Sequence, residues 1–287
     1  MTIAEPEGRV PPPDPESFGR IADLVYRQVG IRLGPGKGYF VEGRLGRLYR
    51  ELRCRDWADL CRQLEATEPG TCRDAFIDAV VTGETQFFRD ELPFRALAEK
   101  ILPEALEGAD QPLRLRVWSA GCSTGQEPFS IAMALWDYVE RGAVELDIWA
   151  TDVSAASLRR VQDGVYDELE LARGLSAERR RRFFEELPGR GARVQGPLRR
   201  AVRFQRLNLA TDPVCGPGFH AVFCRNVAIY FDTEGKRRLH QTLESAVAPG
   251  GYLILGAAET QLLGRSSFRV EHFHRCLLFR KTGGARS

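Results

Sequence analysis

The pattern of hydrophobic and polar positions changes once along the chain, from helical spacing in the first third to short apolar runs separated by glycine beyond it. Asp14 followed by Pro15 is typical of a helix start, and apolar residues then recur at helical spacing as far as Gly30. The same spacing predicts further helices at residues 39–53, 57–64 and 72–81. We therefore expect a small all-helical module at the beginning of the chain.

A strand, a glycine turn and a helix start follow one another in residues 114–134, RLRVWSAGCSTGQEPFSIAMA. The apolar run around Val117 and Trp118 is typical of a strand that is covered on both faces. Gly121 and Gly125 bracket a turn in which the backbone can approach a ligand closely. This order is that of the first unit of a nucleotide-binding α/β domain, although the turn is neither GxGxxG nor a phosphate-binding P-loop.

A second predicted strand, at residues 146–151, ends in Asp152. In a Rossmann-type unit, a carboxylate at this place accepts hydrogen bonds from ribose hydroxyls. An aspartate that follows a strand also often caps the next helix. The residues alone leave both interpretations of Asp152 open.

The rest of the chain alternates between helices and buried strands, with one interruption. Helices are predicted at residues 154–161 and 175–186, and buried strands at 221–224 and 252–255. Between them, residues 188–206 consist of short segments of alternating apolar and polar residues, separated by Gly and Pro, and this pattern predicts a small antiparallel excursion from the main sheet. Residues 268–281 predict a terminal pair of antiparallel strands. Such an α/β sheet is typical of methyltransferases that use S-adenosyl-L-methionine (SAM), although a fold does not fix a function.

Composition and charge exclude several classes of partner, location and site. A formal net charge of +2 argues against bulk binding of nucleic acid. The N-terminus lacks a charged start followed by an apolar core, and no stretch reaches the roughly 18 apolar residues of a membrane span. The seven cysteines lack the spacing of a zinc site or a disulfide framework. We expect a cytoplasmic protein with reduced thiols and no metal, and a disordered leader at residues 1–13.

The simplest interpretation of two arginine clusters is that each lies on a solvent-exposed face of a helix. Arg44, Arg47, Arg50 and Arg53 recur at three-residue intervals on a predicted helix and form a broad basic stripe. The consecutive arginines at 179–182 point around a helix, which makes a poor groove for nucleic acid.

Five motifs, taken together and in order, resemble those of the CheR family, the chemotaxis-receptor glutamate O-methyltransferases. They are TGETQFFRD, RVWSAGCSTGQEPFSIAM, ATDVSAASL with GVYDELE, FCRNVAIYFD and LILGAAE, and the resemblance covers about residues 18–281. It implies an all-helical N-terminal domain at 14–90, a connecting helix and linker at 91–111, and a Rossmann-like SAM-binding domain at 112–283 with a small antiparallel β-subdomain at about 187–206.

The resemblance also implies a site. It makes Arg89 and Tyr230 candidates for arranging the reacting groups. The cofactor contacts that it implies are Thr85, Arg89, Glu127, Asp152, Asn208, Leu209, Arg225 and Asn226. From their chemistry, Glu127 and Asp152 suit the hydroxyls and amino group of SAM, and Arg89 suits a carboxylate. The implied reaction methylates glutamate side chains of a chemoreceptor cytoplasmic domain and leaves S-adenosyl-L-homocysteine.

This sequence departs from the family pattern in two places. Gly83 stands where many members have Asn, so a polar contact to the amino-acid end of SAM is missing or is supplied by Glu84. The excursion at 188–206 is a few residues shorter than in members that dock onto a receptor's C-terminal tether peptide, which weighs against tether docking.

The implied reaction needs positioning more than acid–base chemistry. A glutamate side chain, with a pKa of about 4.3, is already ionised near neutral pH, so its attack on a sulfonium methyl needs no general base. Exclusion of water and alignment of the two groups supply the acceleration. The four histidines, at 220, 240, 272 and 274, have no catalytic partners in motif spacing and are expected to be structural.

The resemblance also changes the interpretation of the basic stripe. Chemoreceptor signalling domains are helical hairpins with acidic methylation faces, so Arg44, Arg47, Arg50 and Arg53 become candidates for binding the substrate. Two other functions stay open: a non-catalytic SAM-binding signalling module, and a nucleic-acid methyltransferase suggested by the arginine clusters. The near-neutral charge disfavours nucleic acid as a partner.

Overall fold

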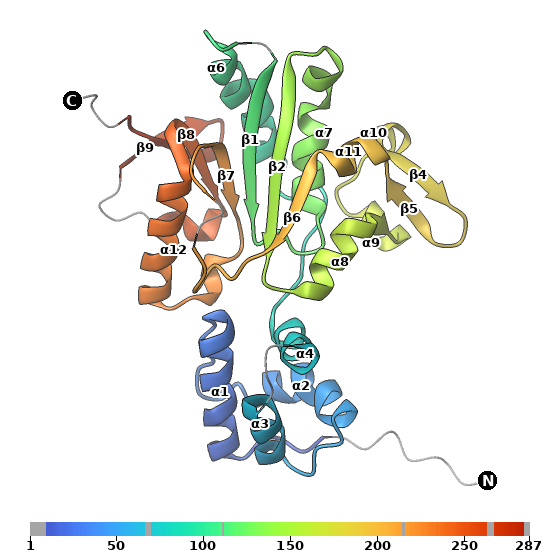
Figure 1. Cartoon of the computed structure of the whole chain (residues 1–287), viewed down its shortest axis with the longest axis vertical. Helices are drawn as coiled ribbons and strands as arrows, with labels where there is room; N and C mark the ends of the chain where they lie inside the picture. The colour runs from blue at the N-terminus through green and yellow to red at the C-terminus, as the bar shows by residue number, and fades with distance from the viewer. Residues whose placement is uncertain (1–9, 67–69, 111, 214–215, 263–266, 284–287) are drawn as a thin grey trace. The chain divides into compact units, whose positions relative to one another are not determined.

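The computed structural model describes residues 10–66, 70–110, 112–213, 216–262 and 267–283 (Figure 1). The chain divides into two compact units, Met1–Thr82 and Gly83–Ser287. Within the described residues, every helix is too short or too polar to span a lipid bilayer. The cysteines in this part of the chain are free thiols, and most of them are buried.

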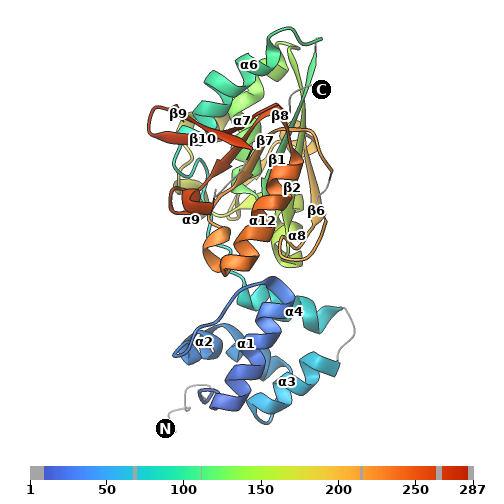
Figure 2. The same cartoon turned by 90° about the vertical axis from the view of Figure 1, so that its left-hand side faces the viewer.

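The first unit is all-helical (Figure 2). Its helices are α1 (Pro15–Val29), α2 (Gly38–Glu51), α3 (Trp57–Ala66) and α4 (Thr71–Val80). The predicted start of α1 is confirmed, since the Asp14 carboxylate accepts a hydrogen bond from the Ser17 N–H at 2.9 Å. Its predicted end is confirmed as well, because Gly30 adopts the left-handed conformation there.

Two expectations for the first unit need correction. Helix α2 ends at Glu51, so Arg53 lies beyond it, with a φ of 52°. The leader is ordered at its end, because Val10 is buried and the Pro11 carbonyl accepts a hydrogen bond from the Trp57 indole at 2.7 Å. Residues 1–9 of the leader lie outside the described residues.

A seven-stranded sheet forms the centre of the second unit, in the order β6-β2-β1-β7-β8-β10-β9 (Figure 1). The strands are β1 (Leu113–Ala120), β2 (Val144–Asp152), β6 (Val202–Arg206), β7 (Phe219–Cys224), β8 (Val247–Leu255), β9 (Phe268–Phe273) and β10 (Cys276–Lys281). The neighbouring pairs from β6 to β8 are parallel, and β10 runs antiparallel to both β8 and β9. The predicted α/β sheet with a terminal antiparallel pair is confirmed.

Helices cover both faces of this sheet (Figures 1 and 2). Val117 packs in one apolar cluster with Phe129 of α7 (Gln126–Glu140), and the adjacent Trp118 packs in a second cluster with Leu239 of α12 (Thr233–Ala246). Successive residues of a strand point to opposite faces, so burial of both explains the continuous apolar run in β1. The other helical segments are α5 (Leu92–Ala96), η1 (Leu97–Ile101), α6 (Leu102–Leu106), α8 (Ala155–Asp163), α9 (Glu168–Ala172), α10 (Ala177–Phe183), α11 (Gly196–Arg200), η2 (Ala228–Tyr230) and η3 (Ala257–Leu262).

The small antiparallel sheet differs from the predicted excursion. It consists of β3 (Val165–Tyr166), β5 (Gly191–Val194) and β4 (Phe184–Leu187), in that order. The helix expected at 175–186 therefore ends at Phe183, because Phe184 pairs with Val194. The last part of the expected excursion, residues 202–206, is instead β6, which runs parallel to β2 at the edge of the large sheet. Alternation along a half-exposed strand does not distinguish these two directions of pairing.

The boundary between the units falls earlier than the expected residue 90. Phe87 and Phe88 are buried in the core of the second unit, where the Phe87 ring meets those of Tyr166 and Phe184 edge to face. The Phe88 N–H also donates to the Ser130 hydroxyl on α7 at 2.9 Å. Residues 83–90, expected in the helical domain, are therefore part of the second unit.

A charged network joins the antiparallel strands to the helical segment before β1. The Glu271 carboxylate on β9 lies 2.7 Å from Arg269 and 3.2 Å from Lys100, and it accepts a hydrogen bond from the Tyr252 hydroxyl. Partial burial raises the pKa of Glu271, but the hydrogen bonds from Arg269 and Lys100 outweigh it and bring the pKa to about 2. A carboxyl whose pKa is lowered on folding stabilises the fold above its unfolded pKa of about 4.3.

We predict that Glu271→Gln lowers the free energy of unfolding at pH 7 by about 1–2 kcal/mol, since it removes charge-assisted hydrogen bonds. The difference should narrow as the pH falls from about 4.3 towards about 2, where the native carboxyl also becomes protonated. Thermal unfolding followed by circular dichroism between pH 7 and pH 3 measures both effects. The exposed Glu185→Gln is the control, and equal melting temperatures for the two variants at pH 7 would contradict the prediction.

Candidate functional site

The polar residues predicted to bind a ligand gather where β1, β2 and β7 end. Thr151 of β2 joins the first two ends, because its carbonyl accepts hydrogen bonds from the N–H groups of Gly121 and Cys122 at 2.8 and 2.9 Å. Parallel strands place their carboxyl ends at one edge of the sheet, which is where ligands bind in open α/β folds. The loops that follow these strands are therefore the candidate site.

Asp152 shapes the loop after β1. One of its carboxylate oxygens accepts a hydrogen bond from the Ser123 N–H at 2.8 Å, and the other accepts one from the Ser154 N–H at 2.9 Å. The cap of α8 is Ser154, whose hydroxyl accepts from the Ser157 N–H. The alternative in which Asp152 caps that helix is therefore wrong, and Asp152 stands at the end of β2 beside the glycine turn.

The two glycines of this turn are required by close packing. Both have positive φ, 78° at Gly121 and 95° at Gly125. A Cβ added at Gly121 would lie 2.5 Å from a methyl group of Val227, and one at Gly125 would lie 2.7 Å from a methyl group of Val161. The turn after β1 is thus packed against the segments that follow β7 and β2.

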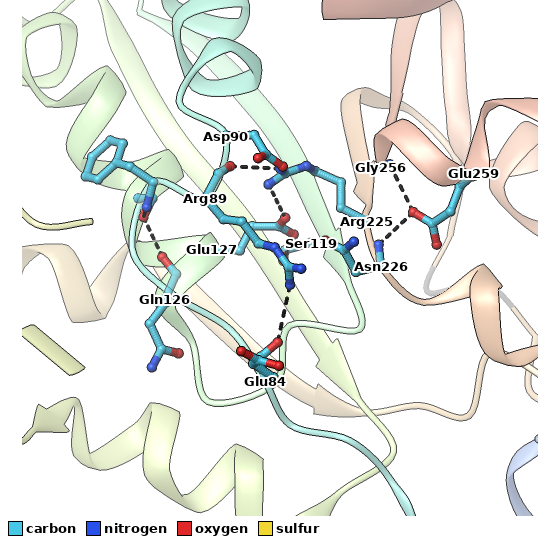
Figure 3. Close-up of polar contacts among 12 residues, drawn as sticks. Glu84, Arg89, Asp90, Ser119, Gln126, Glu127, Arg225, Asn226, Gly256 and Glu259 are labelled. Atoms are coloured by element: carbon cyan, nitrogen blue, oxygen red, sulfur yellow. Dashed lines mark hydrogen bonds and ion pairs between the residues drawn. The ribbon is translucent and has the colours of Figure 1, made fainter. Parts of the chain in front are cut away.

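A buried ion-pair network lies beside the turn (Figure 3). The Glu127 carboxylate accepts a hydrogen bond from the Ser119 hydroxyl at 2.7 Å and another from Arg225 at 3.3 Å. Arg225 also lies 2.7 Å from the carboxylate of Asp90, and it donates to the Arg89 carbonyl at 2.8 Å. Burial raises the pKa of Glu127, and the charge of Arg225 opposes that rise.

Arg225 is the centre of this network. Its side chain is 3% exposed, and its Nε has no hydrogen-bond partner among the described residues. The backbone that surrounds it is strained, since Phe88 and Asp90 both have positive φ, at 48° and 56°. A buried cation needs compensating negative groups, which the Asp90 and Glu127 carboxylates and the Arg89 carbonyl provide.

The predicted Thr85 and Arg89 lie on the segment before α5, and both are partly buried. The Arg89 guanidinium makes one long hydrogen bond, of 3.5 Å, to the Glu84 carbonyl (Figure 3). Within the part of the chain that is described, no carboxylate pairs with Arg89. The Glu84 side chain is engaged elsewhere, 3.1 Å from Arg173.

The remaining predicted contacts follow β6 and β7. The Leu207 N–H donates to the Asp152 carbonyl at 3.0 Å, which brings the adjacent Asn208 and Leu209 to the end of β2. The Asn208 side chain accepts a hydrogen bond from the Ala210 N–H, and Leu209 is buried. On the β7 side, Asn226 has a φ of 61°, and Tyr230 is the last residue of the one-turn helix η2.

The basic stripe lies on the first unit. All of its arginines are exposed. Arg47 pairs with Glu51 at 2.7 Å, and Arg44 donates to the Thr82 hydroxyl at 3.3 Å. The consecutive arginines of α10 are largely neutralised: Arg179 pairs with Glu91, Arg180 with Glu168 and Glu186, and Arg182 with Asp137 and Glu140. This pairing weakens the case for a nucleic-acid groove on α10.

Sequence reasoning missed several residues that build the site. Ser119 carried a signal, since it is a polar residue inside an apolar strand. For Asp90 and Glu259 the sequence offered no signal beyond their presence in motifs. Asp90 pairs with Arg225, and Glu259 binds the backbone after β7, and both partners are distant in sequence. Glu259 is buried and accepts hydrogen bonds from backbone N–H groups at the end of β7.

A cavity of about 230 Å³ lies away from these strand ends. It is lined by residues near the beginnings of β7 and β8, by the η1–α6 segment and by Arg280. His220 is one of its lining residues, and the His220 ring accepts a hydrogen bond from the Arg116 N–H. None of the described residues forms a His, Cys, Asp and Glu cluster that could hold a metal ion.

The polar groups at the strand ends fit a ligand with hydroxyls and an ammonium group. Glu127 and Asp152 supply carboxylate oxygens, which accept hydrogen bonds from both kinds of donor. The buried, unpartnered Nε of Arg225 is a further donor beside them. This donor and acceptor set suits the ribose and amino-acid parts of a nucleoside that carries an amino acid.

We predict that Arg225→Met lowers the free energy of unfolding by about 3 kcal/mol, because it leaves the buried Glu127 carboxylate without its cation. Asp90→Asn is the matched control: Asp90 is 69% exposed, so its loss should cost less than about 1 kcal/mol. Urea-induced unfolding measures both variants. Equal losses for the two would show that Glu127 does not depend on Arg225.

Comparison with known proteins matches both units of the chain to domains of one family. Residues 83–274 match the family model described as CheR methyltransferase, SAM binding domain, and residues 16–81 match the CheR methyltransferase all-alpha domain. A chemotaxis protein methyltransferase of Vibrio parahaemolyticus is 42% identical over 84% of this chain and 90% of its own length. One of Pseudomonas aeruginosa, chemotaxis protein methyltransferase 1, is 41% identical over 82% of this chain and 87% of its own. With both of its units matched, this chain belongs to the CheR methyltransferase family and is a SAM-dependent methyltransferase.

Proposed function

We propose that this protein forms methyl esters on glutamate side chains of the cytoplasmic domain of a chemoreceptor, and that it does so in the cytoplasm. The observation that carries the proposal is the set of carboxylates at the strand ends, beside a buried arginine whose Nε lacks a partner among the described residues. The chemotaxis function of the relatives supports the choice of substrate.

The residues at the strand ends would hold SAM. We assign the adenosine hydroxyls and the amino group to Glu127 and Asp152, and we assign the carboxylate of SAM or of the substrate to Arg89. The remaining proposed contacts are Thr85, Asn208, Leu209, Arg225 and Asn226. When bound, SAM supplies a methyl group on a positively charged sulfur.

Positioning accounts for the chemistry that this chain must perform. A glutamate substrate is already ionised, so the site has to align it and exclude water rather than remove a proton. Arg89 suits this task because no carboxylate among the described residues pairs with it. We assign Tyr230, on η2 after β7, a hydrogen bond near the point of transfer.

Gly83 bears on how the amino-acid end of SAM is held. A Cβ added there would lie 3.4 Å from the Ser123 hydroxyl, which itself donates to the Gly83 carbonyl at 2.9 Å. The backbone at Gly83 thus accepts a side chain after only a small shift. Because the Glu84 carboxylate is paired with Arg173, we do not assign it the missing contact.

We predict that label from tritiated SAM appears on a purified chemoreceptor cytoplasmic fragment and is released as methanol in mild alkali, as an ester requires. Arg89→Ala should lower this transfer by at least 100-fold, because it removes the charge that positions a reacting carboxylate. Tight SAM binding without label on several receptors would contradict the proposal and favour a non-catalytic signalling module.

Asp152→Ala should weaken SAM binding at least tenfold, because it removes the acceptor assigned to the ribose and releases the Ser123 N–H. Isothermal titration calorimetry measures the affinity. Asp163→Ala, an exposed aspartate at the other end of α8, is the control. An unchanged affinity in Asp152→Ala would remove Asp152 from the proposed site.

We propose that the exposed stripe of Arg44, Arg47, Arg50 and Arg53 binds the acidic face of the receptor. Arg47→Glu with Arg50→Glu should raise KM for the receptor at least fivefold at low salt and leave SAM affinity unchanged. The control reverses the same amount of charge on α1 and α3, with Arg27→Glu and Arg62→Glu. An equal rise in KM for both pairs would mean that only net charge matters.

A further inference from the structure

Glu259 is a buried carboxylate to which the proposed chemistry gives no role. It lies in η3, directly after β8, and is 3% exposed. Its two oxygens accept hydrogen bonds from four backbone N–H groups: those of Asn226 at 2.6 Å, Val227 and Ala228 at 2.7 Å, and Gly256 at 3.0 Å. One side chain thus joins the segments that follow β7 and β8.

The number of donors matches the chemistry of the acceptor. An ionised carboxylate has about four lone-pair sites, and each backbone N–H occupies one of them. Hydrogen bonds to a charged acceptor are shorter and stronger than neutral ones. A glutamine side chain would place a donor against some of these N–H groups, so it could not replace the carboxylate.

The surrounding backbone is shaped for this carboxylate. A Cβ added at Gly256 would collide with a Glu259 oxygen, so glycine is needed there for the carboxylate to approach. Asn226 lies in the left-handed region, which asparagine adopts more readily than most other non-glycine residues. The segment after β7 leaves its own N–H groups without a sheet partner, and the carboxylate supplies one for each.

This segment carries groups that the proposed function places at the ligand. Arg225 and Asn226 begin it, and Tyr230 ends it. Figure 3 shows Asn226 between the Arg225–Glu127 pair on one side and Glu259 with Gly256 on the other. The hydrogen bonds of Glu259 thus reach the backbone of 226–228, in the segment that carries these assigned groups.

We propose that Glu259 is a positioning residue for methyl transfer, which fixes the backbone that carries Asn226 and Tyr230. This inference rests on the proposed function, since it assigns those two residues to the same site. A carboxylate with only a structural role would affect stability alone, whereas a positioning residue also affects ligand affinity and turnover at temperatures where the variant is fully folded.

The test compares Glu259→Gln with Glu271→Gln, which makes the same chemical change to a partly buried carboxylate in the network around Tyr252. Hydrogen exchange in the ligand-free full chain reports on the N–H groups of 226–228. Calorimetry with S-adenosyl-L-homocysteine reports on the site, at least 20 °C below the melting temperature of each variant. Methyl transfer at the same temperature separates kcat from KM for SAM.

In Glu259→Gln we expect at least tenfold faster exchange at 226–228, and at least a tenfold loss in S-adenosyl-L-homocysteine affinity or in kcat. In Glu271→Gln, the exchange rates at 226–228, the affinity for S-adenosyl-L-homocysteine and kcat should all stay within twofold of the parent. Affinity and kcat within twofold of the parent in Glu259→Gln would overturn the proposal, even if its melting temperature falls. If the parent methylates no receptor, the proposed function fails, while exchange and affinity still decide the role of Glu259.

Glu259→Asp keeps the charge but is one methylene shorter, and it serves if Glu259→Gln does not accumulate as folded protein. We expect an intermediate loss of affinity for S-adenosyl-L-homocysteine, of threefold or more, because the shorter side chain cannot reach all four N–H groups. Unchanged affinity together with unchanged exchange at 226–228 in this variant would also overturn the proposal.

Discussion

The candidate site depends on the compensation of one buried cation. Arg225 is almost fully removed from water, so its charge must be matched by Asp90 and Glu127 and by the carbonyl of Arg89. These partners come from two distant parts of the chain, the segment before α5 and the start of α7, and Arg225 itself directly follows β7. This ionic centre therefore adds to the burial of Phe87 and Phe88 in holding the 83–91 segment, which carries Arg89, against the sheet.

The same principle recurs in the loops at the strand ends. Once a strand has ended, its backbone N–H groups lose their sheet partners and need others. Asp152 supplies them to the loop after β1, and Glu259 supplies them to the segment after β7. Both loops are thereby held in fixed conformations. Such preorganisation is what a methyl transfer requires when the acceptor is already ionised and no proton has to be removed.

Sequence patterns predicted the elements that depend on local chemistry. The cap and end of α1, the buried strand β1 and the terminal hairpin follow from capping residues and periodicity, and all three are confirmed. The wrong predictions concern strand pairings between segments that are separated along the chain. Phe184 pairs with Val194 instead of continuing the helix, and β6 pairs in parallel with β2. The alternation of apolar and polar residues predicts neither pairing. In the same way, Asp152 was predicted as a site residue from its place after a strand, whereas Asp90 meets an arginine 135 residues away and Glu259 a backbone more than 30 residues away.

We propose that the carboxyl ends of β1, β2 and β7 hold the methyl donor. The most direct test of this proposal is titration of the isotopically labelled chain with S-adenosyl-L-homocysteine, followed by amide chemical shifts in nuclear magnetic resonance. We expect the largest shift changes in the glycine turn at residues 121–125, at Asp152 and at Asn226. Changes concentrated instead around the cavity lined by His220 and Arg280 would contradict the account.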